Sequence, residues 1–251
     1  MADSPASVIL SPELWEFGQR ARALLRSTIE EAVQNDTRPN RDVVHWYVAL
    51  GTLAWDVSGS VLLLLEHGEV RAATMLNRSL FEYWVRIRYY TRFPDKASEA
   101  IHQLPTRIGK IDAARTGTTM PDSFIEEERA EFESYLATGS KIERSNFRND
   151  ILEAVLPKDQ ADAYYDFFYG KASAWIHGYE TMLADVLSAN FHGHRNPNPD
   201  WQTRRFKADD TAGVCIHNVL DCIDEIRTAR NLPQEKTMAA EWDELQRKLG
   251  V

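Results

Sequence analysis

Two sets of polar residues recur at four-residue spacing in segments that are otherwise largely apolar. Arg78 and Glu82 lie in TMLNRSLFEYWVRIRYY, and Tyr169, Ser173 and His177 lie in YYDFFYGKASAWIHGYETML. Residues four apart in a helix are separated by about 40° around its axis and about 6 Å along it, so each set shares one face. Charged groups among apolar residues cost free energy unless they are paired. Both sets therefore indicate specific partners, either inside the protein or in a ligand.

The spacing of Arg78 and Glu82 is compatible with three roles. On a helix the pair shares a sector with Val85 and Tyr89, so both charges are expected in the middle of an apolar strip. One interpretation is a buried salt bridge that fixes the register of the helix. Another is an arginine that Glu82 holds in place so that it can bind an anionic ligand. A solvent-exposed pair is the third.

His177 is the residue of the second set with catalytic potential. An imidazole can gain or lose a proton near neutral pH, so His177 could act as a general acid or base, although a core histidine with a satisfied N–H is the alternative. Ser173 lacks the Gly-x-Ser-x-Gly surroundings of an activated nucleophile, so we expect it and Tyr169 to add hydrogen bonds to a ligand. A row of small residues beside this set indicates either a close helix crossing or the floor of a recess: Gly170, Ala174 and Gly178.

The elements that must position these residues are helices. Apolar periodicity and capping signals predict helices over 12–33, 41–67, 69–92, 158–190, 209–231 and 233–249. Residues 95–157 contain shorter, more charged segments broken by proline and glycine, which predicts a smaller helical insertion or flap. Residues 191–207, with their Asn-Pro-Asn-Pro, are predicted to be a loop. The expected fold class is all-α: one domain over 1–251, built as a bundle of long helices with a helical insertion at 95–157.

Composition limits the classes of partner. A net charge of −9 and a hydrophobic content of 43% predict a folded protein without a broad nucleic-acid or anionic-membrane surface. The N-terminus lacks the pattern of a signal peptide, and the longest strongly apolar run, 61–65, is too short to cross a bilayer. Cys215 and Cys222 are seven residues apart on one predicted helix, about 10.5 Å along its axis, which exceeds disulfide reach. We therefore expect a cytoplasmic protein with reduced thiols and no contact with a membrane.

The two motifs together resemble a known family. LNRSLFEYWVRIRYY, followed some ninety residues later by YYDFFYGKASAWIHG, is similar to a bacterial all-helical family of unknown function whose members share an Arg-x3-Glu helix and a later Tyr-x3-Ser-x3-His helix. The resemblance covers roughly residues 45–190 and implies an all-helical fold. The helical plan is also distantly similar to the HEPN group, many of whose members are RNases in toxin and defence systems. The only segment like the nuclease motif of that group, Arg38 to His45, begins in a loop and contains Pro39, so it does not place both side chains on one helical face.

A metal or cofactor site has little support in the sequence. His192 and His194 form a His-x-His in the predicted loop, but no carboxylate or cysteine has recognisable ligand spacing with them. A glycine-rich phosphate loop and a zinc-protease helix motif are both absent from the chain. We therefore expect neither a metal nor a cofactor.

These patterns lead to two functional hypotheses. In the first, the protein binds or processes a phosphate-bearing ligand, such as a nucleotide or RNA, as a metal-independent hydrolase or nuclease. Arg78, Glu82 and His177 would be catalytic, and Tyr169 and Ser173 would bind the ligand. In the second, the protein is a non-catalytic helical interaction or regulatory protein whose polar network only fixes helix packing, for example across a homodimer.

Overall fold

The computed structural model describes residues 10–34, 41–102, 147–165 and 201–251, and every regular element in these residues is helical. The bundle is formed by α1 (Pro12–Gln34), α2 (Arg41–Glu66), α3 (Val70–Arg92) and α11 (Trp201–Arg230). Around it lie α4 (Pro94–His102), the π-helix η1 (Phe147–Leu152), α7 (Glu153–Val155), α8 (Lys158–Tyr164) and α12 (Lys236–Leu249). The prediction of an all-α fold is confirmed.

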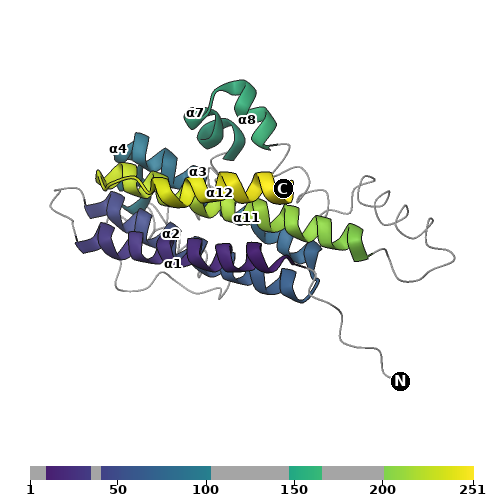
Figure 1. The fold of residues 1–251 in the computed structure, drawn as a ribbon. Coiled ribbons are helices and arrows are strands. Elements are labelled where there is room, and N and C mark those ends of the chain that lie inside the picture. The colour runs from purple at the N-terminus through teal and green to yellow at the C-terminus, as the bar shows by residue number, and fades with distance from the viewer. Residues whose placement is uncertain (1–9, 35–40, 103–146, 166–200) are drawn as a thin grey trace, which may run out of the picture.

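Three of the four bundle helices run in the same direction. The Asn77 amide of α3 bonds the Thr211 carbonyl of α11, and further along both helices Arg88 pairs with Glu225, so α3 and α11 are parallel. Ser11, directly before α1, bonds Asp209, and Glu31 of α1 pairs with Arg227, which makes α1 parallel to α11 as well. Helix α2 is antiparallel to all three, and α12 is antiparallel to α1, which it contacts through the pairs Arg20–Glu241 and Glu13–Lys248 (Figure 1).

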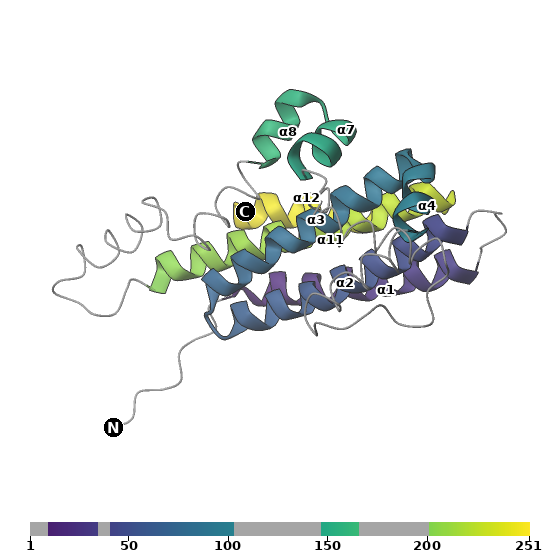
Figure 2. The ribbon, with the colours of Figure 1, turned by 180° about the vertical axis from the view of Figure 1, so that it is seen from behind.

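Helix α11 lies between α1 and α3 and also packs on α2, so it is buried on most of its circumference (Figure 2). Its buried residues include apolar side chains such as Ile216 and Ile223, but also Asp209, Asn218 and Arg227. Cys215 and Cys222 are free thiols buried on this helix, as predicted from their spacing. The polar residues in the core explain why α11 has a weak apolar period in the sequence.

Two close approaches bring α1 and α2 together. A Cβ atom added to Gly18 would lie 2.8 Å from Leu62 Cδ1, and one added to Gly51 would lie 2.9 Å from Ile29 Cδ1. A larger residue would therefore have to displace Leu62 of the core at the first position and the partly buried Ile29 at the second. These glycines set the distance between the two helices.

The helix boundaries predicted from the sequence are largely confirmed. Helix α2 ends before Gly68, whose φ of 80° lies in the left-handed region where glycine is favoured. Helix α3 ends at Arg92, before Phe93 and Pro94. The prediction of a loop over 191–207 is wrong for residues 201–207, because α11 begins at Trp201. The missed signal is Asp200, a residue type that favours helix N-termini, which directly follows the Asn-Pro-Asn-Pro run.

Part of the predicted insertion packs on the bundle. The Trp46 indole of α2 donates to the Ala97 carbonyl of α4 at 2.9 Å, which ties the start of the segment 95–157 to the bundle. Its end packs on α3 through η1 and α7. Residues 103–146 lie outside the described residues, so the boundaries of a separate insertion stay a prediction.

Helix α2 contains the stretch Val44–Glu66, which is long and apolar enough to cross a membrane by length and composition. A core helix of a soluble bundle passes the same test, and α2 packs against α1, α3 and α11. The cytoplasmic location therefore stays a prediction.

Candidate functional site

The pair predicted from the first motif is formed. Arg78 Nε lies 3.3 Å from Glu82 Oε1, and the two side chains retain 22% and 25% of their exposure. The spacing predicted a pair in the middle of a buried apolar strip, but the pair lies beside the buried face of α3. The fully buried face of α3 is centred elsewhere, on Ala73, Leu80, Phe81, Trp84 and Ile87.

The partial exposure of this pair bears on its interpretations. Each side chain is about three-quarters covered, so the pair is neither fully buried nor fully solvated. An arginine that is partly covered and paired with a carboxylate can belong to a structural salt bridge or to an anion-binding site. Both roles therefore stay predictions.

The second motif falls outside the described residues. Tyr169, Ser173 and His177 belong to the segment 166–200, so their approach to Arg78 and Glu82 stays a prediction. The helix predicted to carry them does begin in the described part, at Lys158.

Helix α8, which precedes residues 166–200, packs against α3 through aromatic side chains. The Tyr164 ring stacks on Phe81, with centroids 6.3 Å apart and planes at 17°, and lies 5.7 Å from the Trp84 ring. Phe147 of η1 meets Phe81 edge-on at 5.9 Å, and the Arg86 guanidinium lies over the Phe147 ring. These aromatic contacts place Tyr164, which precedes Tyr169 by five residues in the sequence, against Phe81 and Trp84 of α3.

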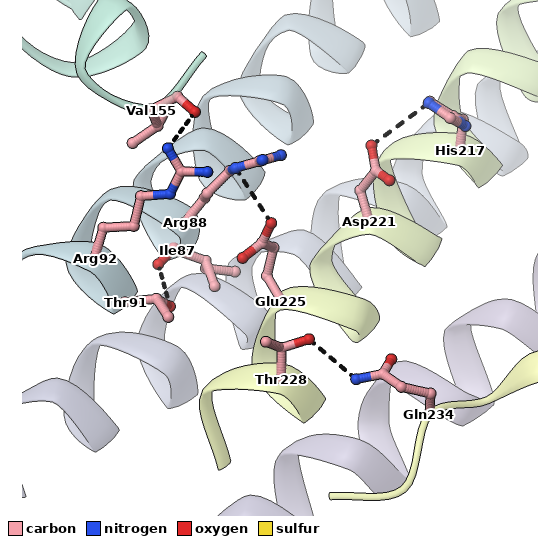
Figure 3. A network of polar contacts seen from close by, with 10 residues as sticks. All are labelled: Ile87, Arg88, Thr91, Arg92, Val155, His217, Asp221, Glu225, Thr228 and Gln234. Carbon is pink, nitrogen blue, oxygen red and sulfur yellow. Dashed lines mark hydrogen bonds and ion pairs between the residues drawn. The ribbon is translucent and has the colours of Figure 1, made fainter. Parts of the chain in front are cut away.

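A second polar assembly, which the sequence patterns did not predict, lies between α3 and α11 (Figure 3). Arg88 Nε is 3.5 Å from Glu225 Oε1, and these side chains are 27% and 20% exposed. One turn earlier on α11, Asp221 Oδ2 lies 3.5 Å from His217 Nε2. One turn later on α3, Arg92 Nη1 donates to the Val155 carbonyl at 2.7 Å. The assembly thus connects α11, α3 and the end of α7.

Burial shifts the acidity of the carboxyl groups in this assembly. It raises the pKa of Asp221 to about 6, an effect that the nearby His217 opposes and Asp224 and Glu225 reinforce. The pKa of Glu225 is also raised by burial, against the opposing effect of Arg88 and Arg92. These groups can therefore change protonation closer to neutral pH than ordinary carboxyls do.

Buried amides form a third polar feature of the same interface. The Asn77 amide donates to the Thr211 carbonyl at 2.8 Å, while its own carbonyl oxygen has no partner among the residues that the structure describes. Asn218 is fully buried, and neither polar atom of its side chain is hydrogen-bonded within the same set of residues. An unsatisfied buried amide costs free energy, so Asn218 weakens the core locally.

The described residues offer little for metal or thiol chemistry. They contain no group of three or more His, Cys, Asp or Glu side chains that could hold a metal ion. Burial raises the pKa of the Cys215 thiol to about 12 and that of Cys222 well above its ordinary value, so both remain protonated at neutral pH. His192 and His194 lie outside the described residues.

Comparison with known protein families gives a match over more than half of the chain. The sequence model of a family of unknown function (DUF5677) matches residues 49–194, which include both motifs. No curated protein and no solved structure matches the chain. The match agrees with the resemblance to an uncharacterised helical family, whereas the likeness to the HEPN group stays a prediction.

Proposed function

The chain belongs to this family of unknown function (DUF5677), and from that premise we propose that it binds a phosphate-bearing ligand, such as a nucleotide or RNA, at the Arg78–Glu82 face of α3. The observation that carries the proposal is the geometry of the pair. Glu82 Oε1 lies 3.3 Å from Arg78 Nε, and the Arg78 side chain as a whole is 22% exposed. A guanidinium fixed in this way is suited to phosphate, because its planar set of N–H donors matches phosphate oxygens.

The charge distribution supports an anionic ligand. Helix α3 carries five arginines and one acidic residue, Glu82, in a chain whose net charge is −9, and three of the arginines, Arg71, Arg78 and Arg86, are not among those that act on Glu225 of α11. The excess of positive charge is therefore local, and it attracts an anion to one helix rather than to a broad surface. Arg71, Arg78 and Arg86 are spaced seven and eight residues apart, which places them within one sector of this helix.

The second motif completes the proposed site. Tyr164 contacts Phe81 and Trp84 of α3. Tyr169 follows Tyr164 by five residues, so its backbone can lie at most about 17 Å from that of Tyr164 even in a fully extended chain. We infer that Tyr169 and Ser173 donate hydrogen bonds to the ligand and that His177 transfers a proton if the ligand is processed. The reaction class is then metal-independent hydrolysis.

A binding titration tests the ligand class. A fluorescein-labelled single-stranded RNA is titrated with the protein, and ribonucleoside monophosphates and inorganic phosphate serve as competitors. Arg78→Ala should weaken binding by at least about tenfold, because a charge-assisted contact with phosphate contributes about 1.5–3 kcal/mol.

The matched control is the pair Arg26–Glu30 on α1, which has the same spacing and order but is 66% and 58% exposed. Arg26→Ala should leave the dissociation constant unchanged. Equal binding by Arg78→Ala and the wild type would rule out this site, and failure of the wild type to bind any of the probes would rule out the ligand class.

A separate assay tests processing. His177→Asn keeps a polar side chain of similar size but cannot titrate, so turnover of a short RNA or a nucleotide should fall by about 10²–10⁴ if His177 transfers a proton. RNA binding measured in parallel separates loss of chemistry from loss of binding. Turnover that survives in His177→Asn would exclude the proton-transfer role.

A further inference from the structure

A line of ionisable residues on α11 faces the arginines of α3. His217, Asp221 and Glu225 follow one another at four-residue steps, so they lie along one side of the helix (Figure 3). Glu225 pairs with Arg88, and Asp221 pairs with His217, each at 3.5 Å. The line is therefore part of the α3–α11 packing rather than a set of independent surface charges.

This arrangement crowds negative charge into a partly desolvated place. Asp221, Asp224 and Glu225 lie within five residues, and the side chains of Asp221 and Glu225 are 26% and 20% exposed. Removing carboxylates from water and placing them near each other both disfavour the ionised form. The ionisable and charged groups around Asp221 are His217, Cys222, Asp224 and Glu225 on α11 and Arg88 on α3, with Arg92 of α3 acting on Glu225.

We propose that this cluster is a proton-uptake site, which binds a proton as the pH falls from neutral to mildly acidic values and then holds the α3–α11 junction more tightly closed. Nothing in this proposal depends on a ligand at Arg78. It makes the junction a pH-responsive element of the fold.

The direction in which pH shifts the junction follows from proton linkage. Burial raises the pKa of Asp221 to about 6 in the closed junction, above the ordinary value of 3.8 that the carboxyl would regain in an opened, solvated junction. The closed form therefore binds the proton more tightly than the open form does. Closing is favoured below pH 6, and this advantage is lost as the pH rises through 6.

The effect extends to α7 through Arg92. This arginine lies in the field of Glu225 and donates to the carbonyl of Val155, which is the last residue of α7 before the extended Leu156. A carbonyl at a helix end has no donor from the helix that it terminates, so Arg92 supplies one. Opening of the junction would free Arg92 to move and would expose the end of α7.

Hydrogen exchange of the full-length protein tests the proposal. Protection factors, which are corrected for the intrinsic exchange rate at each pH, are measured by mass spectrometry for peptides covering α11 at pH 7.5 and 5.5. For a single group whose pKa is about 6 in the closed form and 3.8 in the open form, protection should rise about fourfold on acidification. Asp221→Asn should show the higher protection at both pH values.

The control is Glu30→Gln, which removes an exposed carboxyl from α1 and should leave the pH response of α11 intact. A wild-type protection factor that does not change with pH, or an Asp221→Asn variant with the full response, would overturn the proposal. Carbon-detected NMR titration gives an independent readout: the Asp221 carboxyl should titrate near pH 6, and titration near pH 4 would equally overturn it.

Discussion

Arg88 on α3 lies between Trp84 of its own helix and Glu225 of α11. Its Cζ atom is 6.0 Å from the centre of the Trp84 ring, and its Nε atom is 3.5 Å from Glu225 Oε1. The guanidinium therefore fixes the contact between two helices through one charged and one aromatic partner. Both partners are largely removed from solvent, and Arg88 opposes the rise that burial causes in the pKa of Glu225.

Arg88→Ala should therefore destabilise the protein by about 2–3 kcal/mol, because Glu225 would remain partly buried without its counter-charge. The double variant Arg88→Ala/Glu225→Gln should recover part of this loss, since no unpaired charge remains. Urea unfolding of the three proteins measures the effect. A double variant that is less stable than Arg88→Ala alone would contradict this account of the pair.

Arg78→Ala should cost less, about 1 kcal/mol, because Glu82 keeps enough exposure to be solvated after its partner is lost. Arg26→Ala, from the more exposed pair of the same spacing, should change the free energy of unfolding by less than about 0.5 kcal/mol. Thermal and urea unfolding compare the two variants. A loss of about 3–5 kcal/mol in Arg78→Ala would mean that the pair behaves as a buried one.

Asn218→Leu should stabilise the protein by about 1 kcal/mol, because a leucine, which has the same branching, removes a buried amide that has no hydrogen bond among the described residues. Asn77→Leu should destabilise it instead, because the wild-type amide donates to the Thr211 carbonyl. Unfolding experiments on both variants decide the question. A change in the free energy of unfolding in the same direction for both variants would contradict the argument that hydrogen bonding of the wild-type amide determines the effect.

Asp221→Asn should increase the free energy of unfolding at pH 7.5 by about 1–2 kcal/mol, because the ionised wild-type carboxylate is held in the folded protein at a desolvation cost. As the pH falls from about 6 towards 4, the free energy of unfolding of the wild type should approach that of the variant. The reason is that Asp221 binds its proton at a higher pH in the folded protein than in the unfolded chain. Urea unfolding across this range measures the difference. A gap between the two proteins that stays constant with pH would count against the raised pKa.

Cys215 and Cys222 should react with a thiol reagent only when the protein unfolds. Both side chains are buried, and burial keeps both thiols protonated at neutral pH. The reaction with a chromogenic disulfide reagent should be slow in native buffer and rapid in denaturant. A rapid native reaction would show that α11 opens readily.

Much of the helical framework could be predicted because its signals are local. Pro12 at the start of α1, Gly68 after α2 and Pro94 after α3 mark positions where the backbone has few alternatives. The four-residue spacing of Arg78 and Glu82 likewise predicts their contact on one helix. The start of α11 at Trp201 differs from the predicted loop because the Asn-Pro-Asn-Pro run indicates a loop, whereas Asp200 directly after it is a residue type that favours helix N-termini.

The remaining features depend on which helices meet, and local spacing carries no information about that. The exposure of Arg78 and Glu82 follows from the face that α3 turns towards α11, and the apolar strip around Arg78 gave the wrong centre for that face. Arg88 and Glu225 lie on helices far apart in the chain, so no motif joins them. Asn218 looks like a surface residue in the sequence, yet it is fully buried because α11 is surrounded by other helices.

The position of α11 between α1 and α3 has a consequence for how the chain folds during its synthesis on the ribosome. Its partners Ser11 and Asn77 are 198 and 134 residues away in sequence from the groups that they bond. The first three helices are therefore synthesised long before the helix that fills the space between them. Until residues 201–230 leave the exit tunnel, α11 cannot cover the apolar surface of α1, α2 and α3 that it contacts in the folded protein, and exposed surface of this kind makes a partly synthesised chain prone to aggregation.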